Sequence, residues 1–264
     1  MKKFLVIGSP ISHSLSPELH NHWIKKNNIN AVYEKKKIRE EQIEEIVLEI
    51  KKNKIDGINV TVPYKNKIIP FLDKLTPLAL ESQSVNTIYK EDDKIIGHNT
   101  DIGGFELAVR STNYDPKNKK IFILGAGGVV SSIILSLKKM GVNKISLSNR
   151  TKKKAEELRI KFKNIEILDW GKIPDFDMII NATSIGLNEK DKIKLNYKDM
   201  GPNKFFYDII YNPKQTKFLY EAKKYGNIIE NGKMMFIYQA HQAFAIWHKI
   251  LPKIDEETIR ILNK

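Results

Sequence analysis

The chain has 264 residues, of which 41% are hydrophobic, so it is long enough for one large domain or for two smaller domains with cores of their own. It contains no cysteine, which excludes disulfides, thiolate catalysis and cysteine-held zinc or iron–sulfur sites and fits a reducing, cytoplasmic setting. The net charge of +14 does not indicate a nucleic-acid partner, because the lysines are interleaved with acids and isoleucines along helical patterns such as residues 41–54 and no basic groove motif with aromatic residues occurs.

The first hundred residues alternate strand-like and helix-like patterns, which predicts an N-terminal α/β domain with a mixed sheet. The apolar run at residues 4–7 is the first predicted strand, since it stops at Gly8, well short of a signal peptide or a membrane span. We therefore expect no membrane partner. Helices are predicted next at residues 17–28 and 40–52, and strands at 31–38 and 57–62. Short helices then lead to a hairpin at 84–98.

A second domain is predicted after a helix that begins at Asp101. An apolar run at residues 121–124 enters a glycine turn, and a helical pattern follows. This order predicts a doubly wound, Rossmann-type dinucleotide-binding domain. Its further strands are predicted at residues 144–148, 165–168, 178–181, 205–208 and 227–229, with a helix at 213–225. The last helices, 235–250 and 256–262, have apolar faces that suit packing back on the first domain, so the predicted divisions are 1–101, 102–235 and 236–264.

The glycine turn and the end of the following strand predict the cofactor. Glycines at this turn let the backbone approach a pyrophosphate at a helix N-terminus. NAD enzymes usually carry an acid about 20 residues further on, which holds the ribose 2′-hydroxyl. Here that position offers Asn149, Arg150 and Thr151, followed by three lysines. A guanidinium holds a 2′-phosphate with charge-assisted hydrogen bonds, so we expect NADP(H) as the cofactor. The positive charge of the chain would also attract this anionic cofactor.

Polar clusters follow the predicted strands of the first domain, where open α/β sheets collect ligands, at residues 12–17, 59–65, 85–87 and 97–101. Ser16 suits two roles, capping a helix or, with Ser14, holding a carboxylate at that helix's N-terminus. Lys65 directly follows a strand with alternating polar residues, so a functional role and an ordinary surface position suit it equally well.

The last of these clusters holds two titratable side chains. Asp101 suits a helix cap and a catalytic role equally well. His98 is expected to be a hydrogen-bonded hairpin residue rather than a base or a ligand. No cluster has the spacing of a metal site, so no metal is expected.

Taken in order, these stretches resemble the shikimate dehydrogenase family along nearly the whole chain. The stretches that carry the resemblance are residues 8–17, 59–65, 85–87, 99–105, 125–128, 149–151, 181–186, 207–213 and Gln239. The resemblance implies NADPH-dependent, reversible reduction of 3-dehydroshikimate to shikimate on the route to chorismate and the aromatic amino acids. It also implies that Lys65 and Asp101 form the catalytic pair.

The resemblance further implies two sets of ligand-binding residues. The residues implied to bind the substrate are Ser14, Ser16, Thr61, Asn86, Asp101, Tyr211 and Gln239. The residues implied to bind the cofactor are Gly125, Ala126, Gly127, Gly128, Asn149, Arg150, Thr151, Lys154, Asn181, Thr183, Ser184, Ile209 and Gly232.

Three positions depart from the family pattern, of which Ser84, in place of a typical alanine beside Asn86, is a mild change. Val130 stands where the glycine turn usually ends in Gly or Ala, so close contact between helix and strand must come from Ser131 or Ser132. Met234 stands where the family usually has glycine, and a side chain at a position that suits an unusual backbone leaves the geometry of the nicotinamide-side loop open. The alternatives are a quinate/shikimate dehydrogenase that uses NAD and, from another class, a non-enzymatic NADP-binding protein. The partner is expected to be a small-molecule substrate, and the chain a monomer or a homodimer.

Overall fold

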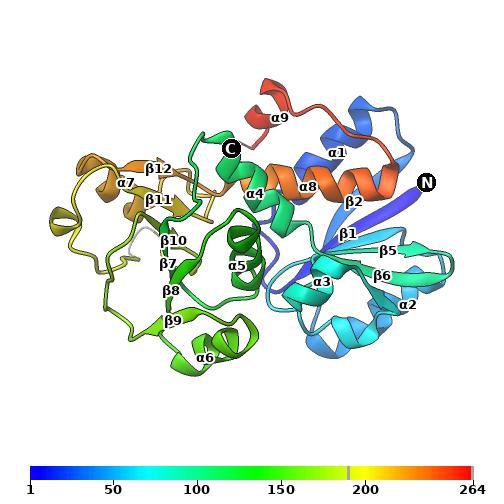
Figure 1. Cartoon of the computed structure of the whole chain (residues 1–264). Coiled ribbons are helices and arrows are strands. Elements are labelled where there is room, and N and C mark those ends of the chain that lie inside the picture. Colours follow the sequence, from blue (N-terminus) through cyan, green and yellow to red (C-terminus); the bar gives the residue numbers. More distant parts are fainter. Residues whose placement is uncertain (189–190, 263–264) are drawn as a thin grey trace. The chain divides into compact units, whose positions relative to one another are not determined.

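The computed structural model describes residues 1–188 and 191–262, which form two compact units (Figure 1). Unit 1 comprises Met1–Gly104 and Ile237–Lys264, and unit 2 comprises Phe105–Phe236. Among the described residues, no helix has both the length and the apolar character needed to cross a membrane. Each unit has its own sheet and its own core, as the sequence patterns predict.

Unit 1 contains a mixed sheet of six strands in the order β2-β1-β3-β5-β6-β4. Strand β1 pairs in parallel with β2 and β3, whereas β5 runs antiparallel to both β3 and β6. The carboxyl ends of β1, β3 and β6 and the start of β5 therefore share one edge of the sheet. The strands are β1 (Lys2–Gly8), β2 (Ala31–Lys37), β3 (Gly57–Val60), β4 (Lys74–Leu75), β5 (Thr87–Glu91) and β6 (Lys94–His98).

The helices of unit 1 cover this sheet with apolar faces. On α2, Ile43, Ile46 and Ile50 are buried in one core cluster with residues of β1 and β3. Helix α8 belongs to the same unit from Ile237 onward, and there the indole Nε1 of Trp247 donates to the carbonyl of Ile88 at 3.1 Å. The helices are α1 (Ser16–Lys26), η1 (Glu40–Gln42), α2 (Ile43–Lys51), η2 (Ile69–Phe71), α3 (Pro77–Ser82) and α9 (Glu256–Arg260), while α4 (Asp101–Ser111) and α8 (Lys233–His248) cross the unit boundaries.

Packing of the returning helix requires a glycine on β3. A Cβ atom on Gly57 would lie 2.4 Å from the indole Nε1 of Trp247, so no larger residue fits without a shift of that ring. In Figure 1, α8 lies beside α1, and the ring of Phe244 on α8 is 5.6 Å from that of Trp23 on α1. The predicted return of the C-terminal helices to the first domain is confirmed.

Unit 2 contains six parallel strands in the order β12-β11-β10-β7-β8-β9, which is the doubly wound order with its switch point between β7 and β10. Both faces of such a sheet are covered, and Phe122, Ile179 and Phe206 are fully buried. The predicted Rossmann-type domain is confirmed. Its elements are β7 (Lys120–Leu124), α5 (Val130–Lys139), β8 (Lys144–Ser148), α6 (Lys152–Lys161), β9 (Ile165–Leu168), β10 (Met178–Asn181), η3 (Tyr197–Met200), β11 (Phe205–Asp208), α7 (Lys217–Lys224) and β12 (Ile228–Glu230).

Two predicted boundaries differ from the structure for local reasons. The strand predicted at 57–62 ends at Val60, because Thr61 begins a turn in which its carbonyl accepts from the amide of Tyr64 at 3.0 Å. The helix predicted at 213–225 begins only at Lys217, where the hydroxyl of Thr216 caps it by accepting from the amide of Leu219. Both differences lengthen a loop that follows a strand.

Candidate active site

Lys65 and Asp101 form a buried ion pair at the edge of the unit 1 sheet where β1, β3 and β6 end. The ammonium Nζ of Lys65 lies 2.6 Å from Oδ2 of Asp101, and the two side chains are only 10% and 7% exposed. Lys65 follows the turn after β3, and its carbonyl accepts from the amide of Val85 at 2.8 Å. Asp101 follows β6 and is the first residue of α4. Little water reaches this pair, so each charge depends on the other.

Asn86 holds the second oxygen of the Asp101 carboxylate. Its side-chain nitrogen donates to Oδ1 of Asp101 and to the hydroxyl of Thr100, both at 2.9 Å, and to Oε1 of Gln239 at 3.5 Å. Its side-chain oxygen accepts from the amide of Thr100 at 2.7 Å. Since Lys65 takes one carboxylate oxygen and Asn86 the other, the orientation of Asp101 is fixed before any ligand arrives.

Ser14 and Ser16 lie where β1 leads into α1. The hydroxyl of Ser14 donates to that of Ser16 at 3.2 Å, and the amide of Ser16 donates to Ser14. Ser16 is the first residue of α1, and the N-cap is Leu15, which makes no side-chain cap. The interpretation of Ser16 as the helix cap is therefore wrong. Two hydroxyls at a helix N-terminus instead suit an anion.

Two other residues of this edge have clear local partners. Thr61 is half-buried beside the end of β1, and a Cβ on Gly8 would lie 2.5 Å from its Cγ2 methyl. His98 shares a 2.8 Å hydrogen bond with the hydroxyl of Thr76, and burial lowers the pKa of His98, which keeps the ring neutral. The prediction that His98 is a hydrogen-bonded hairpin residue is confirmed.

The glycine turn in unit 2 fits a pyrophosphate. Gly125 follows β7 and has a φ of +113°, and a Cβ there would lie 2.6 Å from the carbonyl oxygen of Ala182. Gly127 is exposed, and a Cβ there would meet nothing within 4 Å, so the turn leaves open space next to its backbone. Helix α5 begins at Val130, directly after this turn, and the N-terminus of a helix favours an anion such as a pyrophosphate. Val130 is itself fully buried, as is Ser132, and Ser131 is 8% exposed.

The end of β8 presents unpaired cations. Arg150 and Lys154 are exposed, and no carboxylate of the described residues lies within 4.0 Å of either. Lys152, by contrast, pairs with Asp169 at 2.9 Å. The side-chain nitrogen of Asn149 donates to the carbonyl of Thr151 at 2.8 Å, which shapes the turn. This arrangement suits the 2′-phosphate of NADP(H).

The remaining predicted cofactor residues follow β10 and β11. Thr183 is half-buried and Ser184 is exposed after β10, and Ile209 follows β11. A Cβ on Gly232 would lie 2.0 Å from the carbonyl oxygen of Ile209, so this position requires glycine. The ring of Tyr211 stacks on Phe236 in unit 2 with 4.6 Å between centroids.

Met234 does not occupy a position that needs an unusual backbone. Met234 is the second residue of α8 and has a regular helical backbone, without the positive φ that would favour glycine. Gly232, two residues earlier, is the position where a side chain is excluded.

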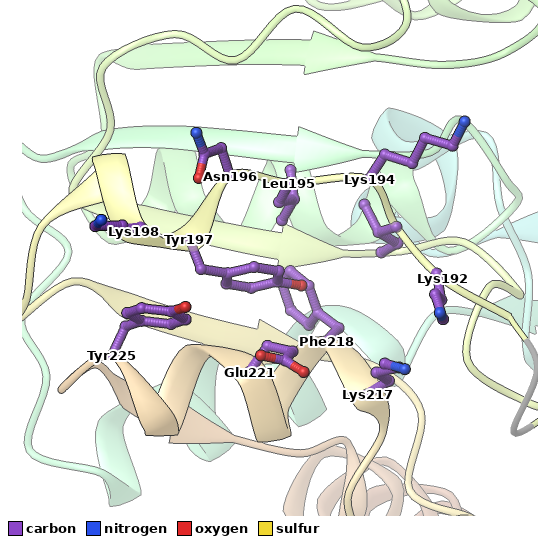
Figure 2. Close-up of a pocket in the computed structure, with 11 residues that line it drawn as sticks. Lys192, Lys194, Leu195, Asn196, Tyr197, Lys198, Lys217, Phe218, Glu221 and Tyr225 are labelled. Atoms are coloured by element: carbon purple, nitrogen blue, oxygen red, sulfur yellow. The ribbon is translucent and has the colours of Figure 1, made fainter.

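One pocket of unit 2 is lined by none of these residues. It encloses about 590 Å³ between residues 192–198 and α7, as Figure 2 shows. Tyr197 and Phe218 lie in its middle, and Lys192 and Lys217 lie together at one end. None of the predicted site residues lines it.

One cluster in unit 1 has the composition of a metal site. His22, Asp255 and Glu257 bring their ligand atoms within 4.8 Å of one another. However, the ammonium of Lys26 donates to Asp255 at 2.7 Å and to Glu257 at 2.8 Å. A cation therefore already compensates these carboxylates, and the cluster joins α1 to the C-terminal segment.

Family models match both halves of the chain. The model described as the shikimate dehydrogenase substrate binding domain matches residues 6–88, and the model described as shikimate / quinate 5-dehydrogenase matches residues 106–215. A curated shikimate dehydrogenase (NADP(+)) of Pelagibacter ubique (strain HTCC1062) is 62% identical over 262 residues, which are 99% of each chain. The chain belongs to the shikimate dehydrogenase family.

Solved structures of shikimate dehydrogenases have the same fold. The enzyme of Aquifex aeolicus superposes with a TM-score of 0.92 at 37% identity, covering 100% of this chain and 98% of that one. The enzyme of Thermus thermophilus, solved in complex with NADP(H) and shikimate, gives 0.89 at 28% identity, covering 100% and 97%. These matches confirm the predicted family, the oxidoreductase activity and the NADP(H) cofactor, and they set aside the non-enzymatic alternative.

Sequence patterns did not reveal the partners of the buried residues that hydrogen-bond to this candidate site. Buried Asn59 accepts from the hydroxyl of Tyr33 at 2.7 Å and donates to the carbonyl of Asn86 at 3.0 Å. Asp208 and Thr216 form a similar buried contact in unit 2, with 2.6 Å between their oxygens. A polar residue at the end of a buried strand is the one available signal, and it does not say which partner the side chain finds.

Proposed function

We propose that this shikimate dehydrogenase reduces 3-dehydroshikimate to shikimate with NADPH, reversibly, and that the polar edge of the unit 1 sheet is its substrate and catalytic site. The buried Lys65–Asp101 pair, with Asn86 on its other oxygen, is the observation that carries the proposal. In this proposal residues 1–101 and the helices of 236–264 form the substrate domain, and residues 102–235 form the NADP-binding domain.

The substrate residues share a chemistry that suits a hydroxylated ring acid. Ser14 and Ser16 would bind the carboxylate at the N-terminus of α1. The donors and acceptors of Thr61, Asn86 and Gln239 would bind ring hydroxyls, which need partners of both kinds. Tyr211, from unit 2, stays a predicted contact of the substrate.

Lys65 and Asp101 would carry the proton transfer. Reduction of the ring ketone places a developing negative charge on its oxygen, which the Lys65 ammonium stabilises before it donates a proton. Asp101 holds that ammonium at 2.6 Å and is oriented by Asn86, so the donor needs little rearrangement. In the reverse direction the neutral Lys65 amine accepts the proton of the shikimate hydroxyl.

The cofactor residues lie at the carboxyl edge of the unit 2 sheet. Gly125, Ala126, Gly127 and Gly128 would hold the pyrophosphate, and Arg150, with Asn149, Thr151 and Lys154, would hold the 2′-phosphate. Thr183, Ser184, Ile209 and Gly232 would line the nicotinamide side. When bound, NADPH supplies the hydride.

Substrate and cofactor preference test the proposal against an NAD-dependent quinate/shikimate dehydrogenase. We expect kcat/KM to be highest for shikimate with NADP+ among the four combinations of shikimate or quinate with NADP+ or NAD+. The unpaired Arg150 and the absence of an acid at the end of β8 favour NADP+. A preference for quinate with NAD+ would reject the proposal.

We also propose that the enzyme is cytoplasmic and works as a monomer or a homodimer. The absence of cysteine fits a reducing compartment. Light scattering of the purified protein distinguishes these two states from larger assemblies, which would contradict the proposal.

A further inference from the structure

Asp208 is a buried carboxylate that the proposed reaction does not use. It is the last residue of β11 and is 0% exposed, and burial raises its pKa to about 6. A buried carboxylate destabilises the fold unless hydrogen bonds compensate its charge. The hydrogen-bond partners of Asp208 therefore indicate its role.

The partners of Asp208 come from two different loops. Its Oδ1 accepts from the side-chain nitrogen of Asn181 at 3.1 Å and from the amide of Ile210 at 3.0 Å. Its Oδ2 accepts from the hydroxyl of Thr216 at 2.6 Å. Asn181 ends β10, whereas Ile210 and Thr216 belong to the loop between β11 and α7. One carboxylate therefore ties the ends of two neighbouring strands together.

The side chain of Asn181 is fully occupied within the protein. It is 0% exposed, and its nitrogen donates to the carbonyl of Ile185 at 3.0 Å as well as to Asp208. Its oxygen accepts from both the amide and the hydroxyl of Thr183, at 3.1 and 2.7 Å. An amide has two N–H donors and two acceptor lone pairs, so no position is left for a ligand.

The backbone completes the same arrangement around Ile209. The amide of Ile209 donates to the carbonyl of Asn181 at 3.1 Å, and the amide of Gly232 donates to the carbonyl of Ile210 at 3.1 Å. Gly232 lies so close to the carbonyl of Ile209 that a Cβ would clash with it. Ile209 is thus fixed from the β10 side and from the start of α8.

We infer that Asp208 and Asn181 are positioning residues, which hold the loops 182–187 and 209–216 at the carboxyl ends of β10 and β11 so that Thr183, Ser184 and Ile209 face the nicotinamide half of NADP(H). Ligands of doubly wound sheets bind at this edge. Asn181, which the sequence indicates as a cofactor contact, acts through these loops instead. The inference rests on the proposed function of unit 2 as the NADP-binding domain.

A matched pair of variants at Asp208 tests the inference. Asp208→Ala removes all three contacts. Asp208→Asn keeps an oxygen for Asn181 and Ile210, and its nitrogen can donate to the Thr216 hydroxyl, which rotates to accept. We expect Asp208→Ala to lower kcat/KM for NADP+ on the order of 30-fold, about 2 kcal/mol, and Asp208→Asn to lie within about threefold of the wild type.

Binding of 2′,5′-ADP, which lacks the nicotinamide half, separates positioning from general damage. We expect calorimetry to give the same Kd for 2′,5′-ADP in the wild type and in Asp208→Ala, because the glycine turn and Arg150 follow other strands, β7 and β8. Equal losses for 2′,5′-ADP and NADP+ would overturn the inference, and so would full activity of Asp208→Ala.

A second pair covers the case in which Asp208→Ala fails to fold. Thr216→Val removes the hydroxyl that donates to Asp208, and Thr216→Ser keeps it. We expect a raised KM for NADP+ in Thr216→Val alone, and identical KM values in the two variants would overturn the inference. The proposed function itself would be rejected if the wild-type protein neither bound 2′,5′-ADP nor oxidised shikimate. That result differs from failure of the inference, in which the wild type is active and the variants are as active as it is.

Discussion

The Lys65–Asp101 pair allows charge burial and catalysis to be measured separately. Lys65→Met removes the ammonium and leaves the Asp101 carboxylate with Asn86 as its remaining side-chain donor among the described residues. Breaking a buried pair in this way destabilises a protein by about 3–5 kcal/mol, and we expect about 3 kcal/mol here because both side chains keep some exposure. For a chain of this length that lowers Tm by roughly 6–12 °C.

The double variant Lys65→Met/Asp101→Asn removes the charge that the single variant leaves unpaired. The amide introduced in place of the Asp101 carboxylate retains an oxygen that accepts from Asn86, so we expect stability within about 1 kcal/mol of the wild type. Turnover should not recover, because the proton donor is still missing, and a loss of about 10²–10⁴-fold is expected in both variants. Urea unfolding and the rate of NADPH formation are measured on the same preparations. Equal stability of wild type and Lys65→Met, or wild-type turnover in the double variant, would refute this reasoning.

Three further predictions concern the cofactor, a buried acid and a buried histidine. Arg150→Ala should lower kcat/KM about 10–100-fold for NADP+ and leave kcat/KM for NAD+ unchanged, because it removes charge-assisted bonds to the 2′-phosphate. Lys152→Ala is the matched control, since Lys152 already pairs with Asp169. An equal loss in both variants would count against Arg150 as the residue that binds the 2′-phosphate. Burial raises the pKa of Asp208 in the folded state to about 6, above its ordinary value of 3.8. The folded protein therefore binds this proton more tightly than the unfolded chain does. The stability that the protonated group contributes at low pH is lost as the pH rises from about 4 to about 6. The unfolding free energy of wild type minus that of Asp208→Asn should therefore fall by about 3 kcal/mol between pH 4 and pH 8, and a constant difference would be inconsistent with a raised pKa. His20 is fully buried with no hydrogen-bond partner for either ring nitrogen among the described residues, and burial lowers its pKa to about 3. His20→Leu should then raise the free energy of unfolding by about 1–2 kcal/mol, with exposed His13→Leu as the neutral control, whereas a marked loss of stability would mean that the ring has a partner.

The fold was predictable because both units follow strong local patterns. The doubly wound order of unit 2 follows from apolar strands that alternate with helices after the turn at Gly125, and the mixed sheet of unit 1 follows from the 84–98 hairpin. Strand β4 was not predicted, because two residues that pair with β6 have no periodicity to detect.

The candidate site was predictable only where its residues stand in recognisable motifs, whether they are buried, as Lys65 and Asp101 are, or exposed, as Arg150 is. Residues such as Lys65, Asp101 and Arg150 stand in short motifs next to strand ends, so their positions could be inferred from the chain. The buried partners Tyr33, Asn59, Asp208 and Thr216 could not, because their hydrogen bonds join residues from different elements whose register depends on tertiary packing.

The most direct test of the account is the formation of NADPH by the purified protein from shikimate and NADP+, followed by absorbance at the nicotinamide band. The account predicts saturable formation of NADPH that depends on both ligands, is reversed by 3-dehydroshikimate and falls at least about 10²-fold in Lys65→Met. No formation of NADPH by the folded wild-type protein, or an undiminished rate in Lys65→Met, would contradict it.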